Sequence, residues 1–374
     1  MLNAISIIVT IGLNSFFPTI LMIIFIVFNS NILGVQIGLL SSLLGIMCQI
    51  FSMHSRNVIL TSKKNDNNLI LLNNRIFLSL IFLVFVLIFL KFNNLIFISF
   101  VPIILFFWVN EILISIYERK KYFYQIKIFF FIILIYILSI ILIVLIAKSY
   151  LLINLNIVFL LIFILNLFYF QIINKNNYKN NYKIKTSITL NFLSSLSFIL
   201  PVFIWRYFIY ENYDINYTSL YFLAFAIASL PGTLFLNVIG VTIIKLKLEY
   251  LFKLVFYFLL LFLLLIIFFK SFFVNFMSYF LASFDMNEFY SSLLFSLLGS
   301  LMMIIAIFKR TKMFIKLKDK SNIYFVDIIN SILICCIVPC VIVFKNNELL
   351  KFSFLFSGLI SFISYHVFIR DQKK

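Results

Sequence analysis

Charged residues are scarce in this sequence. Only 11% of the residues are Asp, Glu, Lys or Arg, whereas about 25% is typical of soluble globular domains. Hydrophobic residues make up 64% of the 374 residues, and apolar segments recur as far as the C-terminus. This pattern differs from a cleaved signal peptide that precedes a soluble domain. The sequence therefore predicts an integral membrane protein whose first apolar segment is retained as a span.

Motifs of catalysis and metal binding are lacking as well. The chain has no Walker A, HExxH or GxSxG motif, so nothing supports ATP hydrolysis, metalloproteolysis or acyl-serine chemistry. Its four cysteines, Cys48, Cys335, Cys336 and Cys340, lie in apolar runs and lack paired C-x-x-C spacing. We therefore predict no catalytic residue, no metal site and no cofactor, and we interpret the cysteines as small apolar side chains.

About twelve stretches are long and apolar enough to cross a bilayer, which takes about 20 residues each as a helix. They are residues 4–29, 32–52, 76–92, 95–117, 128–147, 151–173, 188–210, 217–244, 250–269, 287–308, 323–344 and 352–369. The segment 271–284 is shorter and more polar, and it either extends the ninth stretch or forms an interfacial hairpin. The expected fold is an all-α polytopic membrane protein of about 12 transmembrane helices.

Basic residues concentrate in alternate connections between these stretches. Most of the 30 Lys and Arg residues, Arg75 and Arg310 among them, are assigned to the connections after every second stretch and to the C-terminus. Cytoplasmic loops collect Lys and Arg, so both termini are predicted to be cytoplasmic. The net charge of +18 is then explained by topology and by anionic membrane lipid, and nucleic acid is not an expected partner.

The chain divides into two similar halves. The polar segment "NKNNYKNNYKIKTS" separates them, which predicts an N-terminal six-helix lobe at 1–174, a cytoplasmic linker at 175–187 and a C-terminal six-helix lobe at 188–374. Pro18 and Pro201 stand at similar depths in the first and seventh stretches. We interpret the halves as parallel repeats related by an axis along the membrane normal, with a cavity between the two lobes.

Several segments resemble a known family of exporters. The second half contains "LPVFIWRYFI", then "YFLAFAIASLPGTLFLNVIG" and a basic loop, and the first half contains "GLLSSLLGIMCQIFSMHSRNVIL" and "WVNEILISIYERKKYF". This order resembles the polysaccharide flippases of the multidrug/oligosaccharidyl-lipid/polysaccharide exporter superfamily. The resemblance implies alternating access and translocation of an undecaprenyl-pyrophosphate-linked oligosaccharide, such as an O-antigen or capsule repeat unit. It also implies location in the cytoplasmic membrane, with other membrane proteins of polysaccharide assembly as partners.

Two arginines are candidate substrate-binding residues. A charge inside a bilayer is costly, so buried ionisable residues are functional candidates. Arg206 lies near the end of the seventh stretch, where it either anchors the helix at the interface beside Trp205 and Tyr207 or binds the pyrophosphate of the substrate. Arg56, next to His54, follows the second stretch, where the positive-inside rule explains it equally well.

Two acids are candidate sites for proton or sodium coupling. Glu111 is the deepest acid and shares a helical face with Ser115 and Glu118, so it is expected to point into the protein. It either locks two spans together or couples transport to an ion. Asp327 either couples an ion or complements the N-terminus of the eleventh helix.

Two other functions compete with a flippase. One is an integral membrane glycan polymerase or acyltransferase that uses Asp285, Glu288 or His54. The other is a cation-coupled drug exporter of the same fold, for which an apolar cavity with few arginines would be expected.

Overall fold

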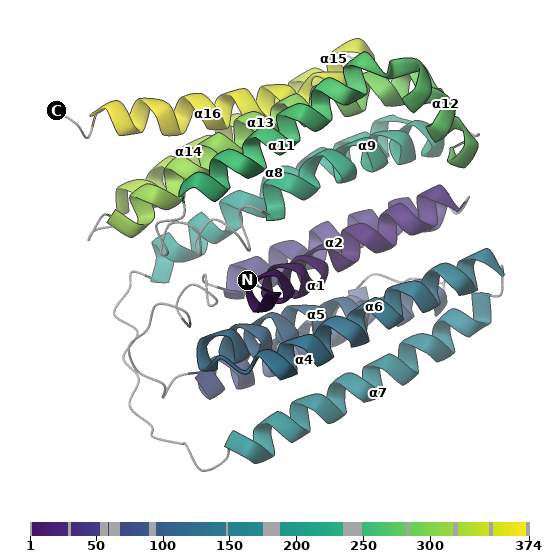
Figure 1. Ribbon diagram of the computed structural model, residues 1–374, viewed down its shortest axis with the longest axis vertical. Coiled ribbons are helices and arrows are strands. Elements are labelled where there is room, and N and C mark those ends of the chain that lie inside the picture. Colours follow the sequence, from purple (N-terminus) through teal and green to yellow (C-terminus); the bar gives the residue numbers. More distant parts are fainter. Residues whose placement is uncertain are drawn as a thin grey trace. The chain divides into compact units, whose positions relative to one another are not determined.

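The computed structural model describes most of the chain as helix (Figure 1). The described residues are 2–28, 31–52, 59, 68–89, 95–146, 149–174, 188–234, 249–281, 284–316, 321–343 and 347–371. Within these ranges the regular elements are all helical. The predicted all-α class is therefore confirmed for the described part of the chain.

The helices follow the apolar stretches of the sequence closely. Their bounds are α1 (Leu2–Val27), α2 (Asn31–Ser52), α4 (Asn68–Phe89), α5 (Leu95–Lys120), α6 (Phe123–Leu145), α7 (Ser149–Asn174), α8 (Ile188–Asn212), α9 (Ile215–Leu234), α11 (Glu249–Phe268), α12 (Lys270–Phe280), α13 (Met286–Lys316), α14 (Ser321–Val343), α15 (Asn347–Lys351) and α16 (Ser353–Asp371).

Several of these helices can cross a bilayer. Five segments of the described chain are long and apolar enough: Val9–Val27, Asn31–Cys48, Ile98–Lys120, Phe123–Leu145 and Met286–Met313. A bent pair formed by α11 and α12 raises the number to six if it counts as one span. The chain is thus a multi-pass membrane protein. The arrangement of about 12 spans in two lobes, and the cytoplasmic position of both termini, stay predictions.

The described residues group into two compact units. Unit 1 comprises Met1–Ile24 and Met47–Ile188, and unit 2 comprises Phe25–Ile46 and Thr189–Lys374. The predicted linker at 175–187 lies outside the described residues. The predicted division into lobes at 1–174 and 188–374 therefore stays a prediction.

In unit 1, α5 is the central helix. It contacts α4, α6 and α7, and nearly every residue from Phe100 to Tyr117 is buried. A helix that is hydrophobic all round is suited to such a position. By contrast α6 buries only the side that carries Ile126, Phe129, Ile133, Tyr136, Ile137 and Ile140. The outward side of α6 is therefore the one available to lipid.

Polar side chains connect the helices of unit 1 at a few buried points. The Asn110 amide donates to Asn14 Oδ1 at 3.0 Å, and the Asn14 amide donates to the carbonyl of Phe107 at 2.9 Å. The Tyr136 hydroxyl donates to Asn156 Oδ1 at 2.5 Å. Hydrogen bonds of this kind hold helices together where the surrounding lipid provides no hydrophobic driving force between them.

In unit 2, α13 is the central helix. It contacts α9, α11, α12, α14, α15 and α16, and α13, α14 and α16 lie side by side (Figure 1). Small residues line its closest contact: a Cβ added at Gly299 would lie 2.5 Å from the carbonyl oxygen of Phe354 in α16. A Cβ at Gly358 would lie 2.8 Å from the Cα of Gly299. The backbones of α13 and α16 approach this closely because glycine has no side chain.

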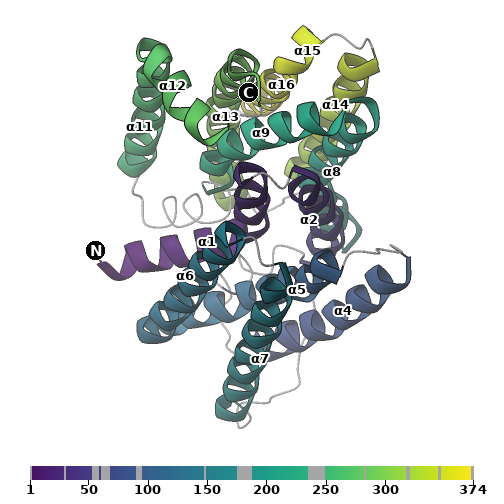
Figure 2. The same cartoon turned by 90° about the vertical axis from the view of Figure 1, so that its right-hand side faces the viewer.

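The junction of α11 and α12 is a sharp bend. Their apolar parts, Phe256–Phe268 and Lys270–Tyr279, meet at an angle of 88° (Figure 2). The segment 271–284 thus begins as a helix that turns away from α11 and does not extend the ninth predicted stretch in a straight line.

Candidate functional site

Arg206 lies in α8 and reaches α2 within unit 2. Its Nη1 donates to the carbonyl of Gly38 at 2.6 Å and to Ser41 Oγ at 3.0 Å. Its Cζ lies 5.6 Å from the ring centroid of Phe222 in α9. The side chain is half-buried, and no carboxylate of the described residues forms an ion pair with it. Its positive charge is therefore held by a carbonyl, a hydroxyl and an aromatic face.

The residues on either side of Arg206 occupy different surroundings. Trp205 is 5% exposed, its Nε1 donates to Ser353 Oγ at 3.1 Å, and its ring stacks on Phe225 with the centroids 3.6 Å apart. Tyr207 is 46% exposed. The indole of Trp205 is therefore part of the core of unit 2, and its position at the membrane interface stays a prediction. Tyr207 is exposed, and its interfacial position likewise stays a prediction.

Arg75 and Glu111 form an ion pair between α4 and α5. Arg75 Nη1 lies 2.9 Å from Glu111 Oε2 and donates to the carbonyl of Trp108 at 2.5 Å. Its Cζ lies 4.8 Å from the Trp108 ring centroid. Only 3% of the Arg75 side chain is exposed, against 30% for Glu111. Glu111 does point into the protein, and its carboxylate joins two helices.

Arg310 and Asp327 form a second ion pair, between α13 and α14. Nε and Nη2 of Arg310 donate to Oδ1 and Oδ2 of Asp327 at 2.8 and 2.7 Å. The hydroxyl of Tyr365 in α16 also donates to Oδ1. Asp327 is not in the first turn of its helix, which holds no acid. The helix-terminus interpretation of Asp327 is therefore wrong, because its side chain meets Arg310 instead.

Glu288 is the centre of a third charged cluster. Its Oε2 lies 2.8 Å from Lys351 Nζ of α15, and its Oε1 accepts a hydrogen bond from the Tyr221 hydroxyl of α9 at 2.6 Å. The neighbouring Asp285 accepts the backbone N–H groups of Asn287 and Glu288 at 2.9 and 3.3 Å, as an N-cap does. Both acids considered for a membrane enzyme thus have structural contacts.

Two of the pairing residues are not identified by the sequence pattern. The positive-inside pattern assigns Arg75 and Arg310 to cytoplasmic connections, but both lie inside helices and are 3% and 7% exposed. Arg75 and Arg310 therefore lie within helices, as Arg206 does. Arg56 and His54 lie outside the described residues. One sequence feature could have indicated the two ion pairs. Each arginine is followed by an acid in the next apolar stretch, Glu111 after Arg75 and Asp327 after Arg310.

Three of the four candidate residues are described, and each has its own partners within its unit. Glu111 belongs to unit 1, whereas Arg206 and Asp327 belong to unit 2 and have separate partners. The described residues contain no group of three or more His, Cys, Asp or Glu side chains that could hold a metal ion.

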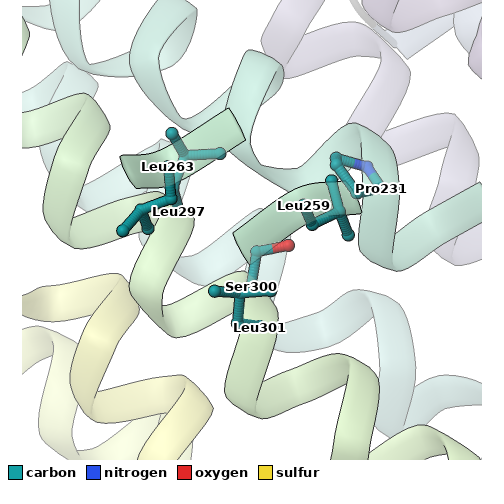
Figure 3. A pocket seen from close by; sticks show the side chains of 6 residues that line it. All are labelled: Pro231, Leu259, Leu263, Leu297, Ser300 and Leu301. Carbon is teal, nitrogen blue, oxygen red and sulfur yellow. The ribbon is translucent and has the colours of Figure 1, made fainter. Parts of the chain in front are cut away.

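A small cavity lies between α9, α11 and α13 in unit 2 (Figure 3). It is lined by Pro231, Leu259, Leu263, Leu297, Ser300 and Leu301 and has a volume of about 10 Å³, comparable to the space that one water needs. The hydroxyl of Ser300 is buried there, and no described residue forms a hydrogen bond with it. The cavity is far too small for a lipid-linked sugar, so it is not a substrate site.

No family model, curated protein or solved structure matches this chain. The resemblance to the exporter superfamily therefore rests on the sequence segments alone.

Proposed function

We propose that this chain is a flippase that translocates an undecaprenyl-pyrophosphate-linked oligosaccharide across the cytoplasmic membrane. The observation that carries the proposal is the open edge of the Arg206 guanidinium. Both hydrogen bonds of Arg206 to described residues use Nη1. Nε and Nη2, the pair of donors that binds a carboxylate or a phosphate side by side, have no hydrogen bond within the described part of the chain.

Arg310 provides the comparison within the same unit. Its Nε and Nη2 are both engaged by Asp327, so this arginine carries its own anion. Arg206 has the same fork of donors but no carboxylate there among the described residues. A pyrophosphate oxygen pair fits this edge in charge and in geometry. We therefore assign substrate binding to Arg206 and a stabilising contact to Arg310.

The two hydrogen bonds of Nη1 hold the Arg206 side chain in place for anion binding. The Gly38 carbonyl and the Ser41 hydroxyl fix one side of the guanidinium, and the Phe222 ring lies 5.6 Å from Cζ. A side chain that is already held in place loses less conformational entropy when it binds an anion. Lysine has no planar fork and would not reproduce this arrangement.

Glu111 is the better candidate of the two acids for proton or sodium coupling. Its side chain is 30% exposed, whereas Asp327 is fully buried. An ion can reach the exposed part of the Glu111 side chain, whereas Asp327 is enclosed in its pair with Arg310. We therefore propose that Glu111 couples transport and that Asp327 stabilises α13 against α14.

The test is a leaflet-resolved measurement of lipid-linked sugar in cells that lack the protein. A flippase defect leaves the lipid-linked units in the cytoplasmic leaflet with the chemistry of polymerisation intact. A normal leaflet distribution combined with unjoined units would instead support the membrane polymerase. Re-expression of the intact chain, with the Arg206→Ala variant as the comparison, shows whether the defect depends on the open arginine edge.

A further inference from the structure

The helix α12 divides its surface into three parts. Phe273 and Met277 are partly buried, and α12 contacts α11 and α13, with the Phe273 and Tyr290 rings 6.2 Å apart. Phe272, Phe276 and Tyr279 are exposed by 71%, 55% and 84%. Their spacing of i, i+4 and i+7 places them along one face of a helix.

The third part of the surface is exposed and polar. Ser271 and Asn275 are four residues apart, so they share a face next to the aromatic one. Lys270 begins the helix, with its Nζ 5.1 Å from the Tyr290 ring centroid. A helix that presents one side to protein, one aromatic side and one polar side to its surroundings is suited to the boundary between acyl chains and headgroups.

The helix before the bend, α11, also exposes an apolar stripe. Phe258, Leu261, Leu265 and Phe268 of α11 follow one another at i, i+3, i+7 and i+10, and each is substantially exposed. The chain then turns by 88° (Figure 2), and the large apolar side chains that α12 exposes, among those described, are aromatic. Tyr and Trp collect at the membrane interface because one end of the side chain is apolar and the other is polar.

We propose that α12 lies in the plane of the membrane interface, with Phe272, Phe276 and Tyr279 among the upper acyl chains and Ser271 and Asn275 in the headgroup layer. A helix that runs along the membrane normal and bends by 88° continues in the membrane plane. We assign phospholipid as the occupant of the aromatic face, because this exposed face follows directly in sequence on the exposed apolar stripe of α11, and the two helices together are apolar enough for a membrane span. This assignment stands independently of the transported substrate.

Depth-resolved quenching of tryptophan fluorescence tests the assignment. The intact chain is reconstituted in phosphatidylcholine vesicles whose acyl chains carry bromine either near the headgroup or near the chain end. Phe276→Trp and Tyr279→Trp are aromatic replacements on the proposed lipid face. Leu261→Trp on α11 is the deep control, and Ser271→Trp marks the polar face. The signal of Trp108 and Trp205 is subtracted with the unsubstituted chain.

The expected result is a shift of the quenching maximum towards the headgroup. The added fluorescence of the Phe276→Trp and Tyr279→Trp variants should be quenched most by shallow bromine, and that of the Leu261→Trp variant most by deep bromine. Deep quenching at position 276 as well would overturn the proposal in favour of a segment that re-enters the bilayer. Absence of quenching at both 276 and 279 would overturn it in favour of a face covered by protein.

Discussion

The guanidinium of Arg310 binds the carboxylate of Asp327 through Nε and Nη2, with both side chains buried between α13 and α14. Arg206 holds its guanidinium through Nη1 alone, at the carbonyl of Gly38 and the hydroxyl of Ser41. Unit 2 thus contains two buried or half-buried arginines. The Nε and Nη2 donors of Arg310 bind a carboxylate, whereas those of Arg206 bind none among the described residues. This difference decides which arginine should affect stability and which should affect substrate binding.

Breaking the Arg310–Asp327 pair from one side should strongly destabilise the protein. Removing one partner of a buried ion pair typically costs about 3–5 kcal/mol, so Asp327→Asn is expected to lower the melting temperature of the protein in detergent. The double variant Arg310→Met with Asp327→Leu removes both charges and should recover most of that loss. Equal destabilisation in the single and double variants would show that the charge pairing is not the stabilising feature.

Arg206 variants should impair substrate binding more than folding. Loss of a hydrogen bond to a charged group costs about 1.5–3 kcal/mol, equivalent to a roughly 10- to 100-fold weaker apparent affinity. We expect Arg206→Ala to show this loss in a vesicle transport assay with lipid-linked pyrophosphate.

Two further variants separate the contribution of the Nε and Nη2 donors of Arg206 from that of its charge and from that of its contacts at Nη1. Arg206→Lys keeps the charge but not the paired donors, so it should restore little transport. Ser41→Ala removes one anchoring contact and leaves Nε and Nη2 in place, so its effect should be smaller. Full transport by the lysine variant would disprove bidentate phosphate recognition at this position.

Glu111→Gln should change the pH or sodium dependence of transport. The substitution removes the titratable group and the counter-charge of Arg75 while keeping a side chain of nearly the same size. We expect the dependence on the coupling ion to flatten, measured as transport rate across a pH series at fixed and at varied sodium. Asp327→Asn is the matched comparison, because its main effect should be on the melting temperature. An unchanged ion dependence in Glu111→Gln would remove Glu111 as the coupling site.

Alanine at two glycines should separate α13 from α16. A Cβ at Gly299 would meet the Phe354 carbonyl carbon at 2.8 Å, and one at Gly358 would meet the Gly299 Cα at 2.8 Å. Overpacking of this kind typically costs about 1–3 kcal/mol, so both variants should melt at a lower temperature than the unsubstituted chain.

Gly232→Ala is the matched control for those two substitutions. Its nearest neighbour for an added Cβ is Ser300 Oγ at 3.5 Å, an ordinary contact distance. Alanine also favours the helical state over glycine by about 0.5–1 kcal/mol, so this variant should be neutral or slightly stabilising. If all three variants melted at the same temperature, close backbone packing would not explain the glycines of α13 and α16.

The positions of the helices could be predicted from the sequence because apolar stretches of bilayer length fix them. The stretch predicted at 151–173 corresponds to α7 (Ser149–Asn174), and the one at 188–210 corresponds to α8 (Ile188–Asn212). The angle of the bend between α11 and α12 could not be predicted, because both helices pack against α13 and the sequence pattern does not show how. The shortness and polarity of segment 271–284 indicated only that it is not a separate membrane span.

The ion pairs could not be predicted, because the predicted helix ends left both arginines just outside the helices. The third stretch is predicted to begin at residue 76, which leaves Arg75 just outside, whereas α4 begins at Asn68. The tenth is predicted to end at residue 308, whereas α13 continues to Lys316 and includes Arg310. Counting charges near span ends does not show whether a side chain meets an acid in the next helix. That information requires the packing of the two helices.

The two arginine pairs also bear on how the chain is synthesised and inserted. Arg75 precedes Glu111 by 36 residues, and Arg310 precedes Asp327 by 17. Each arginine therefore leaves the ribosome before its acid, and each acid lies in the following described helix. A lone arginine is costly in hydrocarbon, so insertion of α4 and α13 is favoured once α5 and α14 have emerged. For the predicted spans that correspond to these helices, the spacing of the charges therefore predicts entry into the bilayer as helical hairpins, α4 with α5 and α13 with α14.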